Sequence, residues 1–229
     1  MAKKSGHRGK DTDREGDGEP TRTARWARRR HEIIRTAEAV FAELGFGAAT
    51  LEEVAARLEL RRASLAYYFD DKEALFDSVF HEILLELRER LRPAFETDDP
   101  IEAMESIASN WVDFLQERPT AGRVLLRQMV DGLAPRSDAT RQSFFELVGL
   151  VRASIERGVE RGLFKALEAG QYGAMIAGTS LLWISSRETL KRGFGFDPLA
   201  PDQMENLRHR LIQLTRQLLQ TSTVESKTP

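Results

Sequence analysis

The side chains best suited to chemistry stand close together between Arg61 and Phe69. Leu65 and Phe69 share one side of a helix because they are four positions apart, which gives a short helix a thin apolar edge. The side chains left for solvent are Arg61, Arg62, Ser64, Tyr67 and Tyr68. Guanidinium groups read guanine and hydroxyl groups bond phosphates, so this set indicates a helix in a DNA major groove. The alternative is a helical corner with a solvated, charged face.

Two neighbouring elements must position that helix. An apolar helix face precedes it, formed by Leu51, Val54, Ala55 and Leu58. Thr50 and Glu53 predict a capping box at the start of that face, in which a hydroxyl and a carboxylate each bond a backbone N–H. Downstream, Lys72 falls in the first turn of the next helix, where a cation opposes the helix dipole. A phosphate at that helix N-terminus would make the charge favourable, so we expect Thr50 and Lys72 to contact phosphates.

The stretch from about Arg29 to Val79 resembles the N-terminal pattern of the TetR/AcrR family of one-component transcriptional regulators. The matching positions are Ile33, Ala37, Phe41, Gly45, Phe46, Thr50, Val54, Ala55, Leu65, Tyr68, Phe69, Lys72, Glu73 and Leu75. The resemblance implies an all-α fold of about nine helices, in which a three-helix helix-turn-helix DNA-binding domain precedes a helical ligand-binding and dimerisation domain. It also implies a homodimer on a pseudo-palindromic operator in double-stranded DNA, with repression as the usual outcome.

Two positions depart from the family pattern. Glu59 stands where the family usually has glycine in the turn between the two short helices, so a reshaped turn is expected. Ala66 replaces a common tyrosine, and Tyr67 is the candidate to supply its phosphate contact. These departures keep open a helical ligand-binding or interaction module that no longer binds DNA, although the retained Arg61 and Arg62 argue against it.

Composition separates a basic start from an acidic remainder. Residues 1–30 hold ten Lys and Arg against five Asp and Glu, while the rest of the chain holds 24 against 31. Such an end suits a polyanion, and we expect Arg28 and Arg29, with Arg25, to reach DNA phosphates from the start of the first helix. The chain has no cysteine, no signal peptide pattern and no apolar run that could span a bilayer, which predicts a cytoplasmic protein without membrane contact.

The apolar spacing predicts helices throughout, and no strand-like alternation occurs. The helices beyond the helix-turn-helix motif are expected at 25–44, 72–91, 100–117, 120–133, 139–162, 166–192 and 202–219. We expect the following division of the chain: a disordered basic tail at 1–24, the DNA-binding domain at 25–75, the effector-binding and dimerisation domain at 76–221, and a disordered tail at 222–229. Helix 72–91 would belong to both domains and end before Pro93.

The last two predicted helices carry patterns typical of an interface. An apolar seam with coiled-coil spacing runs through Met204, Leu207, Leu211, Leu214 and Leu218. The preceding helix has small residues at Ala174, Gly178 and Ser185, which allow backbones to approach closely. Two such helices from each of two subunits would form a four-helix dimer interface. The alternative is that both patterns belong to the core of a single subunit.

A ligand cavity in the second domain is implied by the resemblance. Large, adaptable apolar residues are plentiful there, and a small hydrophobic effector is the partner that they suit. The candidates are Trp111, Phe114, Met129, Phe145, Met175 and Trp183. Such residues more often fill a core. A dry, fully packed domain would instead favour an architectural DNA-binding protein of the same fold without an effector.

No pattern of an enzyme is present. The sequence lacks a glycine-rich phosphate loop, an H-E-x-x-H motif and a G-x-S-x-G motif. The four histidines are scattered without metal-ligand spacing. We therefore expect no catalytic residue, no metal site and no cofactor.

Overall fold

The computed structural model describes residues 21–132 and 135–220, and these ranges hold ten α-helices and no β-strand. The helices are α1 (Arg22–Ala48), α2 (Leu51–Arg57), α3 (Arg62–Ala66), α4 (Lys72–Glu96), α5 (Pro100–Glu117), α6 (Pro119–Asp131), α7 (Asp138–Glu160), α8 (Ala169–Ser185), α9 (Arg187–Phe194) and α10 (Pro201–Leu219). The predicted all-α fold is confirmed. The tail predicted at 222–229 and most of that at 1–24 lie outside the described residues.

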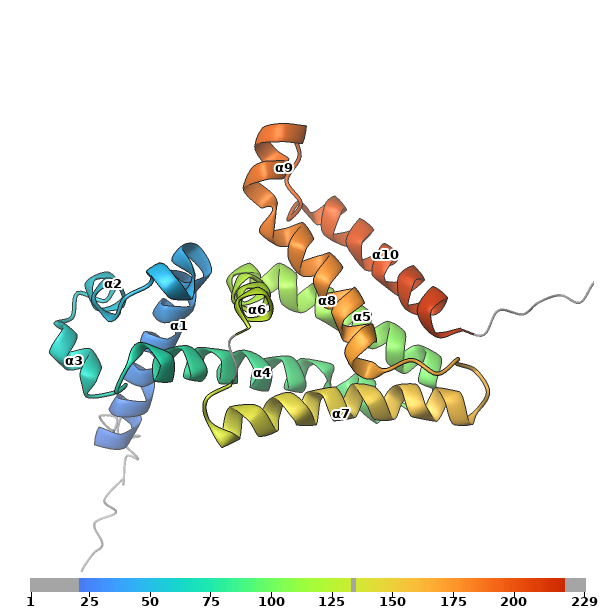
Figure 1. Ribbon diagram of the computed structural model, residues 1–229, viewed down its shortest axis with the longest axis horizontal. Coiled ribbons are helices and arrows are strands. Elements are labelled where there is room, and N and C mark those ends of the chain that lie inside the picture. Colours follow the sequence, from blue (N-terminus) through green and yellow to red (C-terminus); the bar gives the residue numbers. More distant parts are fainter. Residues whose placement is uncertain (1–20, 133–134, 221–229) are drawn as a thin grey trace, which may run out of the picture.

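Two groups of helices lie at opposite ends of the molecule (Figure 1). We call α1–α3 the head and α5–α10 the body. The long helix α4 runs from one to the other and packs against α1, α5 and α7. It was predicted to end before Pro93, yet it continues to Glu96. The proline removes one helix hydrogen bond, but Leu91 and Ala94 on either side remain buried and hold the last turn in place.

The predicted helix 166–192 is in fact two helices, which is why the described residues hold ten helices and not nine. The break falls at Ser186, whose backbone (φ −80°, ψ 9°) leaves the helical region. The Oγ of Ser186 donates to the carbonyl of Leu182, four residues earlier, and side-chain bonds of this kind compete with the helix ladder. The separate α9 buries none of its side chains and projects from the body in Figure 1.

The core of the head continues into α4. Ile33, Ala37 and Phe41 of α1 are buried with Leu75 and Val79 of α4. Gly45 adopts a positive φ of 79°, which bends the end of α1. The bend lets the ring of Phe46 pack back against Phe41 and Phe76, with centroid distances of 6.1 and 5.2 Å. This packing of Phe46 ties α1 to α4.

Candidate nucleic-acid interface and ligand cavity

The turn between α2 and α3 keeps a left-handed geometry without glycine. Glu59 has a φ of 54°. The Leu60 N–H bonds the carbonyl of Ala55 at 2.8 Å, and the Glu59 N–H bonds that of Ala56 at 3.1 Å. This bond pair is the Schellman ending of a helix, which usually carries glycine at the left-handed position. A reshaped turn was expected, but the turn keeps its usual left-handed form. Glu59 adopts the strained conformation in place of glycine, at a cost of about 1 kcal/mol.

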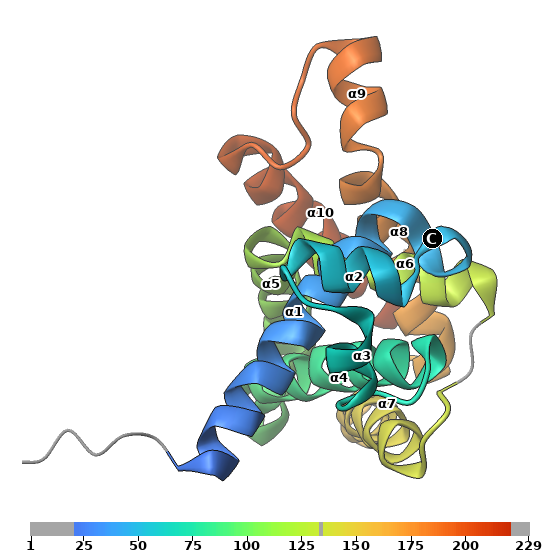
Figure 2. The ribbon, with the colours of Figure 1, turned by 90° about the vertical axis from the view of Figure 1, so that its left-hand side faces the viewer.

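Helix α3 buries its thin apolar edge and exposes the rest. Leu65 is fully buried and Phe69 nearly so, whereas Arg61, Arg62 and Ser64 are exposed. Figure 2 looks at the head and shows α2 and α3 together on the near side, with α3 open to the viewer. Tyr67 is 65 % exposed. The structure therefore brings the predicted polar side chains together on one accessible surface.

Tyr68 is less free than its sequence position suggested. Its ring stacks on Trp26 of α1, with centroids 5.8 Å apart and an interplanar angle of 29°. Its other neighbour is Tyr67, in an edge contact at 5.1 Å. Trp26 was not among the predicted site residues, although one aromatic residue inside the basic run RTARWARRR was the available clue. The stacking fixes α3 against the first turns of α1.

The predicted arginines of the first helix lie on regular helix and not on an extended arm. Helix α1 begins at Arg22, three residues earlier than expected, because the Thr21 hydroxyl caps it by accepting from the Ala24 N–H at 3.2 Å. Arg28 is exposed, and Arg29 donates to Glu32 at 2.6 Å. These first turns of α1 extend past α4 in Figure 1. The stacking of Trp26 on Tyr68 brings the first turns of α1 close to the end of α3, and the phosphate contacts of Arg28 and Arg29 stay a prediction.

The capping box at α2 is half confirmed. The Thr50 hydroxyl accepts from the Glu53 N–H at 3.1 Å, as predicted. The Glu53 carboxylate does not return the bond, because it accepts from Nε of Arg57 at 2.9 Å. Thr50 therefore starts α2 through its side chain, and a phosphate contact for it stays a prediction.

Lys72 has a contact that its sequence position did not reveal. Its Nζ donates to the carbonyl of Phe46 at 2.8 Å and lies 4.5 Å from the centre of the Phe46 ring. The N-terminus of α4 is capped by Asp71, whose Oδ1 accepts from the Ala74 N–H at 2.7 Å. The ammonium thus helps to close the bent end of α1, and its predicted phosphate contact remains untested.

A buried ion cluster joins the head to the body. Arg118, which precedes α6, bonds both Glu38 of α1 and Glu86 of α4. Glu38 is 2 % exposed and also accepts from the Thr120 hydroxyl. Nearby, Arg127 of α6 covers the Gly45 bend of α1. Sequence reasoning missed this cluster, although Glu38 interrupts an otherwise apolar helix stripe.

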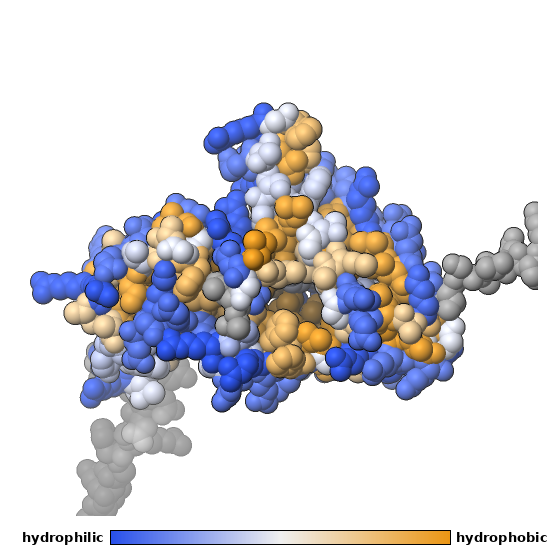
Figure 3. All heavy atoms as spheres, in the orientation of Figure 1, coloured by the Kyte–Doolittle hydropathy of each residue, from blue (hydrophilic) through white to orange (hydrophobic). Residues whose placement is uncertain are grey.

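A cavity of about 310 Å³ lies inside the body between α4, α5, α6, α7 and α8. No charged side chain lines it. The Nε1 of Trp111 donates to Ser180 at 2.8 Å, and the Tyr172 hydroxyl pairs with that of Thr215 at 3.0 Å. Burial raises the pKa of Tyr172 to about 12, so its phenol stays neutral. Figure 3 shows hydrophobic side chains around a hollow in the middle of this face. The cavity is therefore suited to an uncharged apolar molecule.

Two of the six predicted ligand residues line this cavity, namely Trp111 and Met129. Phe114 lies in the core behind Trp111, their ring centroids 5.9 Å apart. The other three are turned elsewhere: Phe145 is 67 % exposed, Met175 is 46 % exposed, and Trp183 packs on Phe196. Most of the lining comes instead from residues whose spacing is that of ordinary helix core, among them Phe80, Leu84, Leu87, Val148 and Val151.

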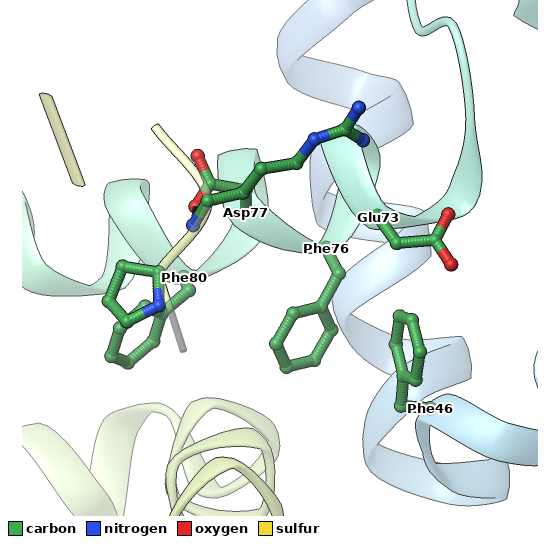
Figure 4. Close-up of a pocket in the computed structure, with 7 residues that line it drawn as sticks. Phe46, Glu73, Phe76, Asp77 and Phe80 are labelled. Carbon is green, nitrogen blue, oxygen red and sulfur yellow. Dashed lines mark hydrogen bonds between the residues drawn. The ribbon is translucent and has the colours of Figure 1, made fainter. Parts of the chain in front are cut away.

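A second hollow of about 330 Å³ lies where the head meets the body. Figure 4 shows the rings of Phe46, Phe76 and Phe80 in a row along it. Above them, Asp77 accepts from the Ser137 hydroxyl at 2.6 Å and from the Arg136 N–H at 2.7 Å. Burial raises the pKa of Asp77, but these hydrogen bonds outweigh it and leave the pKa lowered. The start of α7 is thus held on α4 by an ionised carboxylate, and Phe80 lines both hollows.

The predicted seam on the last helix is mostly internal. Met204, Leu207 and Leu211 are buried within the subunit, where α10 packs along α5, so the interface prediction was wrong for these three. The exposed apolar stripe lies on α8, where Met175 and Leu182 are 46 % and 61 % exposed. Solvent-facing residues of this kind on a helix that is apolar on nearly all sides indicate a surface that a partner covers.

No helix of the described residues is long and apolar enough to cross a membrane. No group of three or more potential metal ligands occurs in the same part of the chain.

Comparison with known proteins agrees with this architecture. Residues 33–79 match the family model described as bacterial regulatory proteins, tetR family, and residues 100–214 match the tetracyclin repressor-like C-terminal domain. The HTH-type transcriptional repressor NicS of Pseudomonas putida is 28 % identical over 174 residues, which cover 74 % of this chain and 82 % of NicS. The regulator BetI of Stenotrophomonas maltophilia is 33 % identical over 100 residues, which cover 43 % of this chain and 51 % of BetI.

Solved structures share the fold. The ketosteroid transcriptional regulator KstR2 of Mycobacterium tuberculosis superposes with a TM-score of 0.65 at 19 % identity, covering 85 % of this chain and 96 % of KstR2. AibR, solved in complex with isovaleryl coenzyme A and operator DNA, gives a TM-score of 0.65 at 14 % identity and covers 81 % of this chain and 97 % of its own.

Proposed function

The chain belongs to the TetR family of bacterial regulatory proteins, and we propose that it represses transcription until a small, uncharged, apolar molecule fills the cavity of its body. It is a helix-turn-helix DNA-binding transcriptional regulator. The observation that carries the proposed effector class is the cavity lining, which offers apolar surface and no charged group. Its proposed place of action is the cytoplasm, because its DNA target lies there.

DNA reading is proposed for the exposed surface of α3. Arg61 and Arg62 are the candidates for guanine, where one bidentate pair is worth about 1–3 kcal/mol. The hydroxyl and ammonium groups of Ser64, Tyr67, Tyr68, Thr50 and Lys72 are the proposed phosphate contacts, together with Arg28 and Arg29. The exposure of Arg61, Arg62, Ser64 and Tyr67 on and beside α3 supports this assignment for those four residues.

A homodimer would present two such surfaces to a pseudo-palindromic operator. The exposed stripe of α8 is the proposed contact, because Met175 and Leu182 are exposed in the single subunit and a second subunit would bury them. Ala174 and Gly178 on the same helix carry small side chains, which let a second α8 approach closely. The two α3 helices would then reach half-sites about 34 Å, or a multiple of it, apart.

The proposed effector differs from one whose charged head group enters the cavity. AibR was solved with isovaleryl coenzyme A. A phosphate of such a molecule would meet no cationic side chain among the residues that line the cavity of this chain. Burying an unpaired charge is costly, so a neutral molecule is favoured. The 310 Å³ of space also argues against the architectural alternative, which would need a filled body.

Helix α6 supplies a route from the cavity to the head. Leu125 and Met129 line the cavity, while Thr120 and Arg127 of the same helix contact α1. Phe80 of α4 supplies a second route, because it separates the cavity from the hollow beside Phe76. A ligand that fits the cavity only after α6 or Phe80 has shifted would favour a different position of the head.

The test begins with full-length protein titrated against its own upstream DNA and a scrambled duplex at two salt concentrations. A preference of about a thousandfold, with two subunits bound per half-site pair, supports the dimeric regulator. Three sets of compounds are then screened for release of the DNA. They are a neutral set of steroids and long-chain alcohols, a set of fatty acids, and a set of acyl-coenzyme A thioesters. Release by the neutral set supports the proposal, and release by the thioesters alone overturns the effector class.

A pair of glycines makes the screen specific to the cavity. Gly173 lines the cavity and Gly149 lies on the outer side of α7, and a Cβ added at either meets nothing within 4 Å. Gly173→Leu should fill the cavity and abolish release while DNA binding persists. Gly149→Leu should respond like the wild type. If both variants keep the response, the effector binds elsewhere.

A further inference from the structure

We propose that Glu52 sets the base specificity of this regulator by holding the Arg62 guanidinium end-on toward a guanine, and that its charge lowers the general affinity for DNA in return. The inference rests on the proposed reading of DNA by α3. It assigns a function to an acidic residue that no DNA-binding pattern in the sequence had included.

The geometry that carries the inference is one contact between two short helices. Oε1 of Glu52, near the start of α2, lies 2.9 Å from Nε of Arg62, in the first turn of α3. It is the single ion pair between α2 and α3 among the described residues. Both side chains are exposed, so the pair adds little to the stability of the free protein. A structural role is therefore a poor explanation of it.

The atom that Glu52 engages decides what Arg62 can still bind. A guanidinium carries five N–H donors, of which Nε supplies one. Glu52 lies nearest to Nε as an ion pair and not as a hydrogen bond, so the four N–H groups of the two terminal nitrogens form no bond with Glu52. That fork matches the O6 and N7 acceptors of guanine in the major groove. The contact thus selects one way of presenting Arg62.

Holding Arg62 in advance also reduces the entropy that binding must remove. A free arginine side chain samples many rotamers, and a side chain that is already fixed loses less conformational entropy on binding. The opposing effect is electrostatic, because a carboxylate within about 10 Å of phosphates repels them at 0.1 M salt. Glu52 should therefore raise discrimination between sequences while weakening binding to all of them.

The neighbouring residue provides a matched control. Glu53 carries the same charge in the same turn of α2, but its carboxylate accepts from Arg57 on its own helix. Both glutamates interact equally well with the N-terminus of α2. Glu52→Gln and Glu53→Gln therefore remove the same charge, and only the first releases Arg62.

The experiment selects an operator from a random duplex pool with the full-length wild type. Dissociation constants are then measured for the selected duplex, for duplexes with each guanine replaced, and for a scrambled duplex. Glu52→Gln should bind the scrambled duplex more tightly and lose about tenfold of the discrimination at one guanine position. Glu53→Gln should bind all duplexes more tightly with unchanged discrimination. Thermal unfolding of each variant verifies that the fold is retained.

Arg62→Ala separates the failure of this inference from the failure of the proposed function. If Arg62→Ala leaves every guanine penalty unchanged while Arg61→Ala removes one, α3 reads DNA as proposed and the inference about Glu52 is overturned. If both variants leave every guanine penalty unchanged, α3 does not read DNA as proposed. If Arg62→Ala removes one guanine penalty while Glu52→Gln keeps or increases it, DNA reading stands and the role of Glu52 is overturned. Glu52 would then be a competitor for Arg62.

Discussion

The surface beside the first turn of α4 and the cavity beside its middle are suited to opposite kinds of binding. Beside its first turn, α3 presents charged and hydroxyl groups that are already solvated, so a partner must replace water with better-placed hydrogen bonds. Around its middle, Phe80 and Leu84 face a cavity without charge, where a ligand gains by displacing water from apolar surface. The first kind depends on direction, register and salt. The second depends on volume and shape, which tolerate more change in the side chains.

The largest predicted effect comes from comparing a core residue of the body with a residue that lines the cavity. Phe114 is fully buried behind Trp111, whereas Met129 is 48 % exposed at the cavity. Phe114→Ala should lower the free energy of unfolding by about 3–5 kcal/mol, because it leaves an unfilled space in packed core. Met129→Ala should cost about 0.5 kcal/mol or less and alter effector affinity instead. Urea unfolding at one protein concentration compares them, and equal losses would mean that Met129 is core.

The junction between head and body gives the next largest effect. Arg118→Met should cost about 3 kcal/mol, because it leaves the buried Glu38 carboxylate without its main partner. Arg90→Met removes an arginine from the exposed Glu117 and should cost far less. Thermal unfolding of both variants measures the difference. Similar losses would show that the pair between α1 and α6 is no more important than a surface contact.

A stabilising change is expected within the head. Glu59→Gly should raise the free energy of unfolding by about 1 kcal/mol, because glycine adopts the left-handed turn at φ 54° without strain. Glu59→Ala keeps the Cβ and should give no such gain. Calorimetry of the two variants distinguishes backbone strain from charge. A gain in the alanine variant would assign the effect to the carboxylate.

The smallest effect concerns pH. Effector affinity should stay constant from pH 6 to 9, because Tyr172, with a pKa of about 12, is the one titratable side chain lining the cavity and stays neutral. Titration of Tyr172 affects the protein only in strong alkali, where it lowers the stability of the fold. The phenol of the unfolded chain has its ordinary pKa of about 10, whereas the folded one stays neutral until about 12, so stability falls as pH rises above 10. A marked dependence of effector affinity on pH below 9 would place a charged group in the site.

The contrast between the surface and the cavity also explains how far the sequence could be interpreted. Arg61 and Arg62 were predicted to be exposed because guanidiniums on a short helix serve no packing need, and the structure confirms their exposure; their reading of DNA stays a prediction. Phe80 and Ala177 were not recognised as cavity residues, because a cavity is a property of the space between helices and leaves no mark on any single residue. The spacing of apolar residues predicted every long helix but not the break at Ser186, which depends on a local side-chain hydrogen bond.

Contacts over long sequence distances account for the other differences. Lys72 bonds the carbonyl of Phe46, and Trp26 stacks on Tyr68, through folding that no local pattern describes. Met204 and Leu207 carry interface spacing, yet α5 lies beside them and covers them. Periodicity states that a helix face is apolar. It does not state whether the same chain or a second chain covers that face.

Among the described residues, the hydrogen bonds and ion pairs that join the head and α4 to the body come from α1, from α4 and from its capping Asp71, and α3 takes part in none of them. The exposed side chains of α3 are therefore free to drift in evolution without disturbing the machinery that senses the effector. After a gene duplication, a few substitutions between Arg61 and Tyr68 would give a copy that obeys the same signal at a new promoter. The response to the effector can then be inherited while the recognised promoter changes. For the same reason an engineer could exchange the DNA-reading residues without rebuilding the effector cavity.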